Sequence, residues 1–178
     1  MSQDGMKIMY KYLPLLVFLC LFSCKKGEEV LPDATQSGEN TFGAYVNGEL
    51  WVPKGRPSTF EPNFSLTFDP GYHGGTLQIQ AYRVQDNDQT KFEYIQISAI
   101  EIESEGLYYL DNTQKGSVIF EGDCYFQGSE EGVSQEGNLE ITRLDLEVGI
   151  IAGKFEFTLA KAGCDTIRVT DGRFDYQL

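Results

Sequence analysis

The stretch Lys154-Phe155-Glu156-Phe157-Thr158-Leu159 alternates strictly between polar and apolar side chains. A period of two residues is typical of a half-buried β-strand, because successive side chains point to opposite faces of the sheet. Similar short runs recur about every ten residues and are separated by turn residues, a spacing typical of all-β folds. No stretch beyond residue 40 shows the period of a long amphipathic helix. The pattern therefore predicts an antiparallel, all-β domain.

We expect about ten short strands arranged as a β-sandwich of two sheets. A closed, calycin-like β-barrel is the alternative, because a series of hairpins can build either architecture. The predicted strands cover residues 42–46, 49–52, 64–68, 76–82, 92–102, 107–110, 118–120, 124–126, 139–146 and 155–159, followed by a final hairpin.

Three dipeptides predict where these strands turn or kink. Asn47-Gly48 favours a type I′ hairpin turn. A change of parity in the apolar pattern predicts a β-bulge at Thr142-Arg143. Asp171-Gly172 predicts the last hairpin, in which Ile167–Val169 would pair with Phe174–Tyr176.

Residues 1–23 have the features of a secretory signal peptide. Lys7 and Lys11 precede an apolar core from Leu13 to Phe22, and the small residue Ser23 follows it. The core is about half the roughly 20 apolar residues that a membrane-spanning helix needs. We therefore predict that this segment is removed after export.

The sequence Leu21-Phe22-Ser23-Cys24 resembles the lipobox of bacterial lipoproteins, in which the cysteine receives diacylglycerol. This resemblance implies a lipid anchor at Cys24. Two or three acyl chains would hold the protein on the membrane far more firmly than one. It also implies the outer membrane, on its periplasmic or outer side, because no aspartate follows Cys24 as in the inner-membrane retention signal of enteric bacteria. The alternative is an ordinary signal peptide that leaves Cys24 as a plain thiol.

The remaining sequence divides into two parts. Residues 24–40 contain no aromatic side chain and are rich in Gly, Glu, Ser and Pro, so we expect a lipidated cysteine followed by a flexible tether. Residues 41–178 have a length that suits a single domain. The whole chain has a net charge of −13, which disfavours binding to nucleic acid.

Cysteine usage agrees with export. Cys20 would leave with the signal peptide and Cys24 would carry lipid, so Cys124 and Cys164 remain as a pair. We predict a disulfide between them, since leftover cysteines commonly bond in an oxidising compartment. Two buried free thiols are the alternative. No metal site is expected, because two cysteines and the single His73 lack the clustered spacing of zinc ligands.

Both ends of the predicted domain also resemble a known family. The opening stretch at residues 42–51 (FGAYVNGELW) and the closing stretches at residues 139–146, 153–157 and 170–175 look like the uncharacterised Bacteroidetes lipoproteins of the DUF6252-like group. The resemblance implies the phylum, the lipoprotein address and a β fold. It implies no catalytic residue and no cofactor.

We find no catalytic constellation in the sequence. His73, the only histidine, and the neighbouring Tyr72 lie in a Gly-rich segment that we predict to be a loop, and they are the candidate ligand-binding residues. Glu101, Glu103 and Glu105 would share one strand face, either as an acidic site or as the solvated side of the strand.

Two further groups of residues invite a binding interpretation. Asp86-Asn87-Asp88 offers oxygen ligands for calcium but lacks the EF-hand frame, so an Asx-rich turn is the alternative. The aromatic residues could form a glycan-binding surface, for which Trp51, Tyr72, Tyr108 and Tyr109 are the candidates. A buried, structural role is the alternative, particularly for Trp51.

The sequence thus predicts a lipid-anchored outer-membrane or surface lipoprotein with a non-catalytic β domain. That domain would have a binding or structural role, with a glycan or a protein as the ligand. The alternatives are a carrier of a small apolar ligand, which needs an enclosed apolar cavity, and an acid–base glycosidase, which needs two carboxylates in a cleft.

Overall fold

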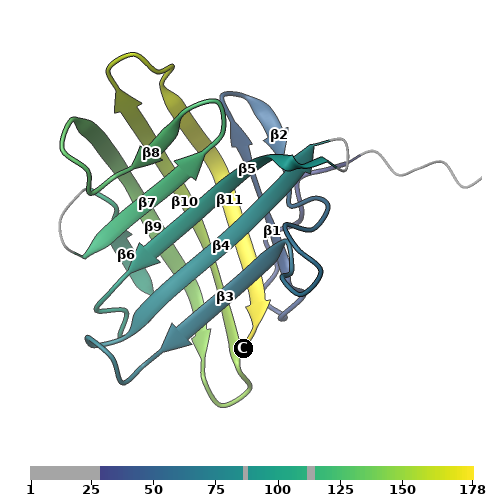
Figure 1. Cartoon of the computed structure of the whole chain (residues 1–178). Helices are drawn as coiled ribbons and strands as arrows, with labels where there is room; N and C mark the ends of the chain where they lie inside the picture. The colour runs from purple at the N-terminus through teal and green to yellow at the C-terminus, as the bar shows by residue number, and fades with distance from the viewer. Residues whose placement is uncertain (1–28, 86–87, 112–114) are drawn as a thin grey trace, which may run out of the picture.

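The computed structural model describes residues 29–85, 88–111 and 115–178 and contains two antiparallel β-sheets that pack face to face (Figure 1). Sheet A has the strand order β2-β1-β11-β10-β9-β6, and sheet B has the order β3-β4-β5-β7-β8. The strands are β1 (Thr41–Val46), β2 (Glu49–Trp51), β3 (Phe64–Asp69), β4 (Thr76–Gln85), β5 (Asp88–Ala99), β6 (Gly106–Tyr109), β7 (Gly116–Glu121), β8 (Tyr125–Gln127), β9 (Val133–Asp145), β10 (Ile150–Lys161) and β11 (Ile167–Gln177).

The sheets do not close on each other, so the predicted β-sandwich is confirmed and the barrel alternative is wrong. The strands of the two sheets run in crossed directions in Figure 1. Within the described ranges, no helix has the length and apolar character needed to cross a membrane.

The core between the sheets follows from the alternating pattern. On β10, Phe155 and Phe157 are buried between the sheets, whereas Lys154 is exposed. The ring of Phe42 lies 5.8, 5.4 and 5.1 Å, between centroids, from the rings of Trp51, Phe64 and Phe155. Because Phe64 belongs to sheet B and the other three rings to sheet A, this aromatic cluster joins the two sheets.

Two of the predicted kinks are confirmed. Asn47 and Gly48 have φ angles of 51° and 85°, which place them in the left-handed region that a type I′ turn requires between β1 and β2. In the pairing of β10 with β9, Ala152 lies opposite Arg143 and Gly153 lies opposite Ile141. Thr142 is therefore the extra residue of a β-bulge.

The predicted hairpin at Asp171-Gly172 is wrong. β11 continues through both residues and lies between β1 and β10, with which it pairs on its two sides. Asp171 has a φ of 52°, and the register of both pairings shifts close to it. A left-handed residue followed by glycine suits a bulge as well as a turn, and here the two neighbouring strands keep the chain extended.

The first described residues differ from the predicted flexible tether. We call residues 29–40 the N-terminal strap. Glu29 pairs with Lys54 at 2.7 Å and lies 4.0 Å from Arg83. From Leu31 and Pro32, which lie over Gly43 of β1, the strap follows the outer face of sheet A. Asp175 of β11 accepts hydrogen bonds from the strap, and Arg143 of β9 donates one from Nη1 to the Gln36 carbonyl at 2.5 Å. The folded unit therefore begins before the predicted boundary at Thr41.

The predicted disulfide between Cys124 and Cys164 is confirmed, with a Cα–Cα distance of 6.2 Å. Cys124 lies in the β7–β8 hairpin of sheet B, and Cys164 lies in the β10–β11 turn of sheet A. The bond therefore joins the two sheets at one end of the sandwich.

Candidate functional site

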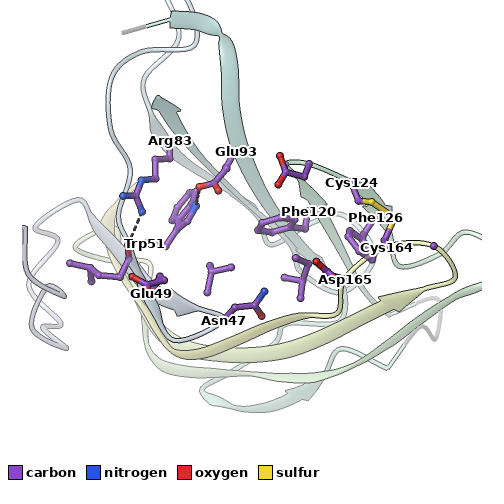
Figure 2. A pocket seen from close by; sticks show the side chains of 16 residues that line it. Asn47, Glu49, Trp51, Arg83, Glu93, Phe120, Cys124, Phe126, Cys164 and Asp165 are labelled. Carbon is purple, nitrogen blue, oxygen red and sulfur yellow. Dashed lines mark hydrogen bonds between the residues drawn. A yellow bond between two sulfur atoms is a disulfide. The ribbon is translucent and has the colours of Figure 1, made fainter. Parts of the chain in front are cut away.

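A cleft of about 620 Å³ opens at the end of the sandwich that carries the disulfide (Figure 2). Its walls come from the β1–β2 turn, β2, the ends of β4 and β5 that lie near the β4–β5 turn, the β7–β8 hairpin and the β10–β11 turn. Both sheets therefore contribute to it. The volume falls in the range of about 300 to 1,000 Å³ that is typical of small-ligand sites.

Two charged side chains enter the cleft from the inner face of sheet B. Arg83 has the parity of the buried Ala81 on β4, and Glu93 has the parity of the buried Ile95 on β5. The register places Arg83 directly opposite Glu93. Both side chains therefore point between the sheets, where the pattern elsewhere places apolar residues.

Sheet A holds these two side chains in place. The indole Nε1 of Trp51 donates a hydrogen bond to Glu93 Oε2 at 2.8 Å, and Arg83 Nη1 donates one to the Leu50 carbonyl at 2.6 Å. Trp51 is only 2% exposed, so its N–H group would be costly to bury without a partner. These bonds link β2 to β4 and β5 across the sandwich.

The charge of the cleft is mainly negative. Glu49, Glu93, Asp123 and Asp165 line it, against the single guanidinium of Arg83. A concave site with an excess of one charge raises the local concentration of oppositely charged ligands. No group of three or more His, Cys, Asp or Glu side chains in the described part of the chain is placed to hold a metal ion. The excess of carboxylates in the cleft suits a ligand of positive charge.

The predicted ligand-binding pair lies elsewhere. Tyr72 and His73 are exposed in the β3–β4 loop, at the opposite end of β4 from Arg83, and their ring centroids are 4.1 Å apart. His73 has a φ of 48°, and its carbonyl accepts a hydrogen bond from the Glu101 N–H at 3.1 Å. The structure therefore joins this loop to the acidic segment, but not to the cleft.

The three glutamates do not share a strand face. β5 ends at Ala99 rather than at Ile102, because Glu101 adopts a left-handed φ of 61° that breaks the extended backbone. Glu101 then pairs with Lys115, and a carboxylate oxygen of Glu105 accepts a hydrogen bond from the Leu144 N–H at 3.3 Å. All three glutamates are exposed.

The other candidates have separate positions. Of the calcium candidates, Asp86 and Asn87 lie outside the described residues, and a carboxylate oxygen of Asp88 accepts hydrogen bonds from Thr90. Tyr109 is 65% exposed on β6, an edge strand of sheet A. The neighbouring Tyr108 is half buried and donates its hydroxyl hydrogen to the Ser104 carbonyl at 2.6 Å.

Arg83 and Glu93 were not predicted as site residues, although the alternating pattern of their strands contains a signal for them. Each is a charged residue next to a series of apolar core positions (77, 79 and 81 on β4, and 95, 97 and 99 on β5), and each has the parity of those positions. Such a departure marks a position where packing alone does not explain the residue.

No protein-family model, curated protein or solved structure matches this chain. The predicted membership of the Bacteroidetes lipoprotein group therefore stays a prediction. Function is inferred from the cleft and from the N-terminal sequence.

Proposed function

We propose that this chain is an exported lipoprotein, anchored in the outer membrane through lipid at Cys24, whose sandwich binds a small cationic ligand in the end cleft without catalysing a reaction. The signal-like residues 1–23 and the lipobox-like residues 21–24 support the proposed export and membrane anchoring. The disulfide between Cys124 and Cys164 supports export too, because such bonds persist in oxidising compartments.

The inward-facing pair Arg83 and Glu93 is the observation that carries the binding role. Both side chains are half-buried. Even partial burial of a charged group costs free energy, which apolar residues at these positions would not incur. Here the two groups are held by Leu50 and Trp51 and face an open cleft. A preorganised polar group at the mouth of a packed core is typical of a ligand site.

The chemistry of the cleft indicates the class of ligand. The four carboxylates that line the cleft favour a ligand that carries an amine or a guanidinium. Val46, Leu50 and Ile167 add apolar contacts on the same walls. An open, charged cleft differs from the enclosed apolar cavity that a carrier of an apolar molecule needs.

The single tryptophan provides a direct assay of ligand binding. Trp51 gives the one indole N–H resonance of the protein, and that N–H contacts Glu93 in the cleft. The mature chain, residues 24–178 with Cys24→Ser, is titrated with linear diamines and with short lysine- or arginine-containing peptides. We expect the indole resonance to shift with these cations and not with glutamate-containing peptides of equal length.

The variant Glu93→Gln should weaken this binding by about tenfold or more, because a charged hydrogen-bonding partner is lost. Glu140→Gln, at an exposed position on sheet A, is the matched control and should bind as the parent does. Absence of any shift across the cationic panel would overturn the cleft assignment. Hydrolysis of aryl glycosides that Glu93→Gln abolishes would instead favour the glycosidase.

The anchor has a separate test in cells. Metabolic labelling with an alkyne fatty acid should mark the full chain and should fail for Cys24→Ala, which should also move to the soluble envelope fraction. Labelling that survives in Cys24→Ala would refute the anchor. Protease treatment of intact cells then separates an outward-facing protein, which is degraded, from a periplasmic one.

A further inference from the structure

A second surface with an unusual composition covers the outer face of sheet B. Two adjacent rows of side chains cross it from β4 to β8, on the face opposite the buried core positions of the same strands. The register aligns the members of each row across the sheet, with Glu121 and Ile119 of β7 standing between the β5 and β8 members of the two rows. We call these six residues the tyrosine–glutamine platform: Tyr82, Tyr94 and Tyr125 in one row, and Gln80, Gln96 and Gln127 in the next.

Hydrogen bonds fix the orientation of the platform's amides and hydroxyls. Gln80 Nε2 donates to the Tyr94 hydroxyl at 2.8 Å, and that hydroxyl donates to Gln96 Oε1 at 2.6 Å. The Tyr125 hydroxyl donates to Gln127 Oε1 at 3.2 Å. Polar groups that are already ordered lose little conformational entropy when a ligand binds.

The tyrosines of the row differ in exposure. The rings of Tyr82 and Tyr94 lie 4.5 Å apart between centroids. Tyr82 is half-buried, whereas Tyr94 is only 8% exposed and serves mainly to support the Tyr82 ring. Tyr125 is 46% exposed at the β8 end of the row. Tyrosine gives a large, rigid, amphipathic contact area at low entropic cost.

The platform is nearly free of charge in a protein of net charge −13. Glu121, between Tyr94 and Tyr125, is the one ionisable carboxylate in the two rows. The outer face of sheet A differs sharply, since one row there aligns Glu140, Lys154 and Arg173. An anionic polymer would be repelled by the protein as a whole, and a cationic partner would be drawn to its acidic surfaces instead.

We propose that the tyrosine–glutamine platform binds a neutral polysaccharide that lies across the strands of sheet B. Ring faces of tyrosine can stack on sugar rings, while oriented amides can donate and accept hydrogen bonds with sugar hydroxyls. From β4 to β8 the platform spans three inter-strand steps, or about 14 Å, which is enough for a few sugar rings. The site is separate from the cleft and does not depend on the proposed cationic ligand or lipid anchor.

The test is retention of the mature chain, residues 24–178 with Cys24→Ser, on insoluble and gel-embedded neutral polysaccharides. The panel comprises cellulose, chitin, starch, xylan and a β-1,3-glucan, with the acidic polymers alginate and polygalacturonate for comparison. We expect retention on at least one neutral polymer, no retention on the acidic ones, and no loss at high salt, because the contact involves no ion pairing.

Matched variants assign the contact to the platform. Tyr82→Ala and Tyr125→Ala should each weaken retention about two- to tenfold, as expected for the loss of one ring contact. Tyr109→Ala, which removes a more exposed tyrosine from sheet A, should change nothing. Glu93→Gln, in the cleft, should also leave retention unchanged, so the two proposals can fail separately.

Three outcomes would overturn the proposal. One is absence of retention on every neutral polymer while circular dichroism shows folded protein. A second is an equal loss of retention in Tyr109→Ala and Tyr125→Ala. A third is a concentration-dependent dimer that Tyr125→Ala dissociates, because the platform would then be occupied by a second copy of the chain.

Discussion

Asp175 is a buried carboxylate enclosed by the N-terminal strap. It accepts hydrogen bonds from the Thr35 hydroxyl at 2.8 Å and from the backbone N–H groups of Ser37, Gly38 and Glu39 at 2.9, 2.8 and 3.2 Å. Burial by itself would raise the pKa of Asp175, but these hydrogen bonds outweigh it and hold the pKa below the usual value. The ionised side chain thus fastens the strap to β11.

The low pKa of Asp175 makes this fastening sensitive to acid. Because the pKa is lower in the folded chain than in the unfolded chain, the ionised group adds stability above the unfolded value of about 4. That stability is lost as the pH falls through the folded value. Asp175→Asn should lower the free energy of unfolding by about 1 to 3 kcal/mol at neutral pH. The reason is that the hydroxyl and N–H groups of the strap lose the carboxylate oxygen that accepts their hydrogen bonds. The difference from the parent should shrink in strong acid.

Urea unfolding of the two proteins at neutral and at acidic pH measures this effect. Asp171→Asn is the control, because Asp171 lies on the same strand but is exposed, and asparagine tolerates its left-handed backbone. Equal effects of the two substitutions would show that the strap contributes nothing through Asp175.

At the scale of an element, β11 is a central strand of sheet A that carries a bulge. It lies between β1 and β10, and its bulge at Asp171-Gly172 shifts the register with both neighbours. A side chain at position 172 would overlap the ring and the carbonyl of Phe155 on β10. Glycine is needed there for close packing, while Asp171 supplies the left-handed backbone.

Gly172→Ala should destabilise the protein by about 1 to 3 kcal/mol, because the added methyl group forces Phe155 or the backbone to move. Gly132→Ala is the comparison: Gly132 has a φ of 85° but open space around it, so only the backbone strain of about 1 kcal/mol applies. The midpoints of thermal unfolding of both variants check the order. A larger loss in Gly132→Ala would show that φ, and not crowding, dominates.

Strand positions could be predicted from the sequence because alternation is a local property of the chain. Whether a residue with a left-handed backbone makes a turn, makes a bulge or ends a strand could not be predicted in this way. Asn47 makes a turn, Asp171 makes a bulge and Glu101 ends a strand, and these outcomes depend on which strands lie alongside. The cleft was missed for a similar reason. The sequence shows that Arg83 and Glu93 are charged, but not that they contact β2. Their hydrogen-bond partners, the Leu50 carbonyl and the Trp51 indole, come close only when the two sheets pack together.

At the scale of the whole molecule, two kinds of link hold the sheets together around the cleft. The Trp51–Glu93 hydrogen bond crosses the sandwich on one side, and the Cys124–Cys164 disulfide crosses it on the other (Figure 2). The cysteines are 40 residues apart in sequence, so β8, β9 and β10 lie within the closed loop. Covalent and polar contacts thus frame the cleft together with core side chains, since the buried Trp51, Phe120 and Phe126 also line it.

Removal of the disulfide should therefore affect stability and the cleft together. A closed loop of this length contributes about 4 kcal/mol in the chain-entropy model, which is a large part of the roughly 5 to 15 kcal/mol that stabilises a typical domain. The double variant Cys124→Ser/Cys164→Ser should lose about that much in urea unfolding and should still fold. Its Trp51 indole resonance should broaden or move, because one wall of the cleft is released. Reduction of the parent protein should reproduce both effects. If stability falls while the indole resonance stays sharp and unmoved, the disulfide acts on the unfolded chain alone, and the Trp51–Glu93 contact suffices to shape the cleft.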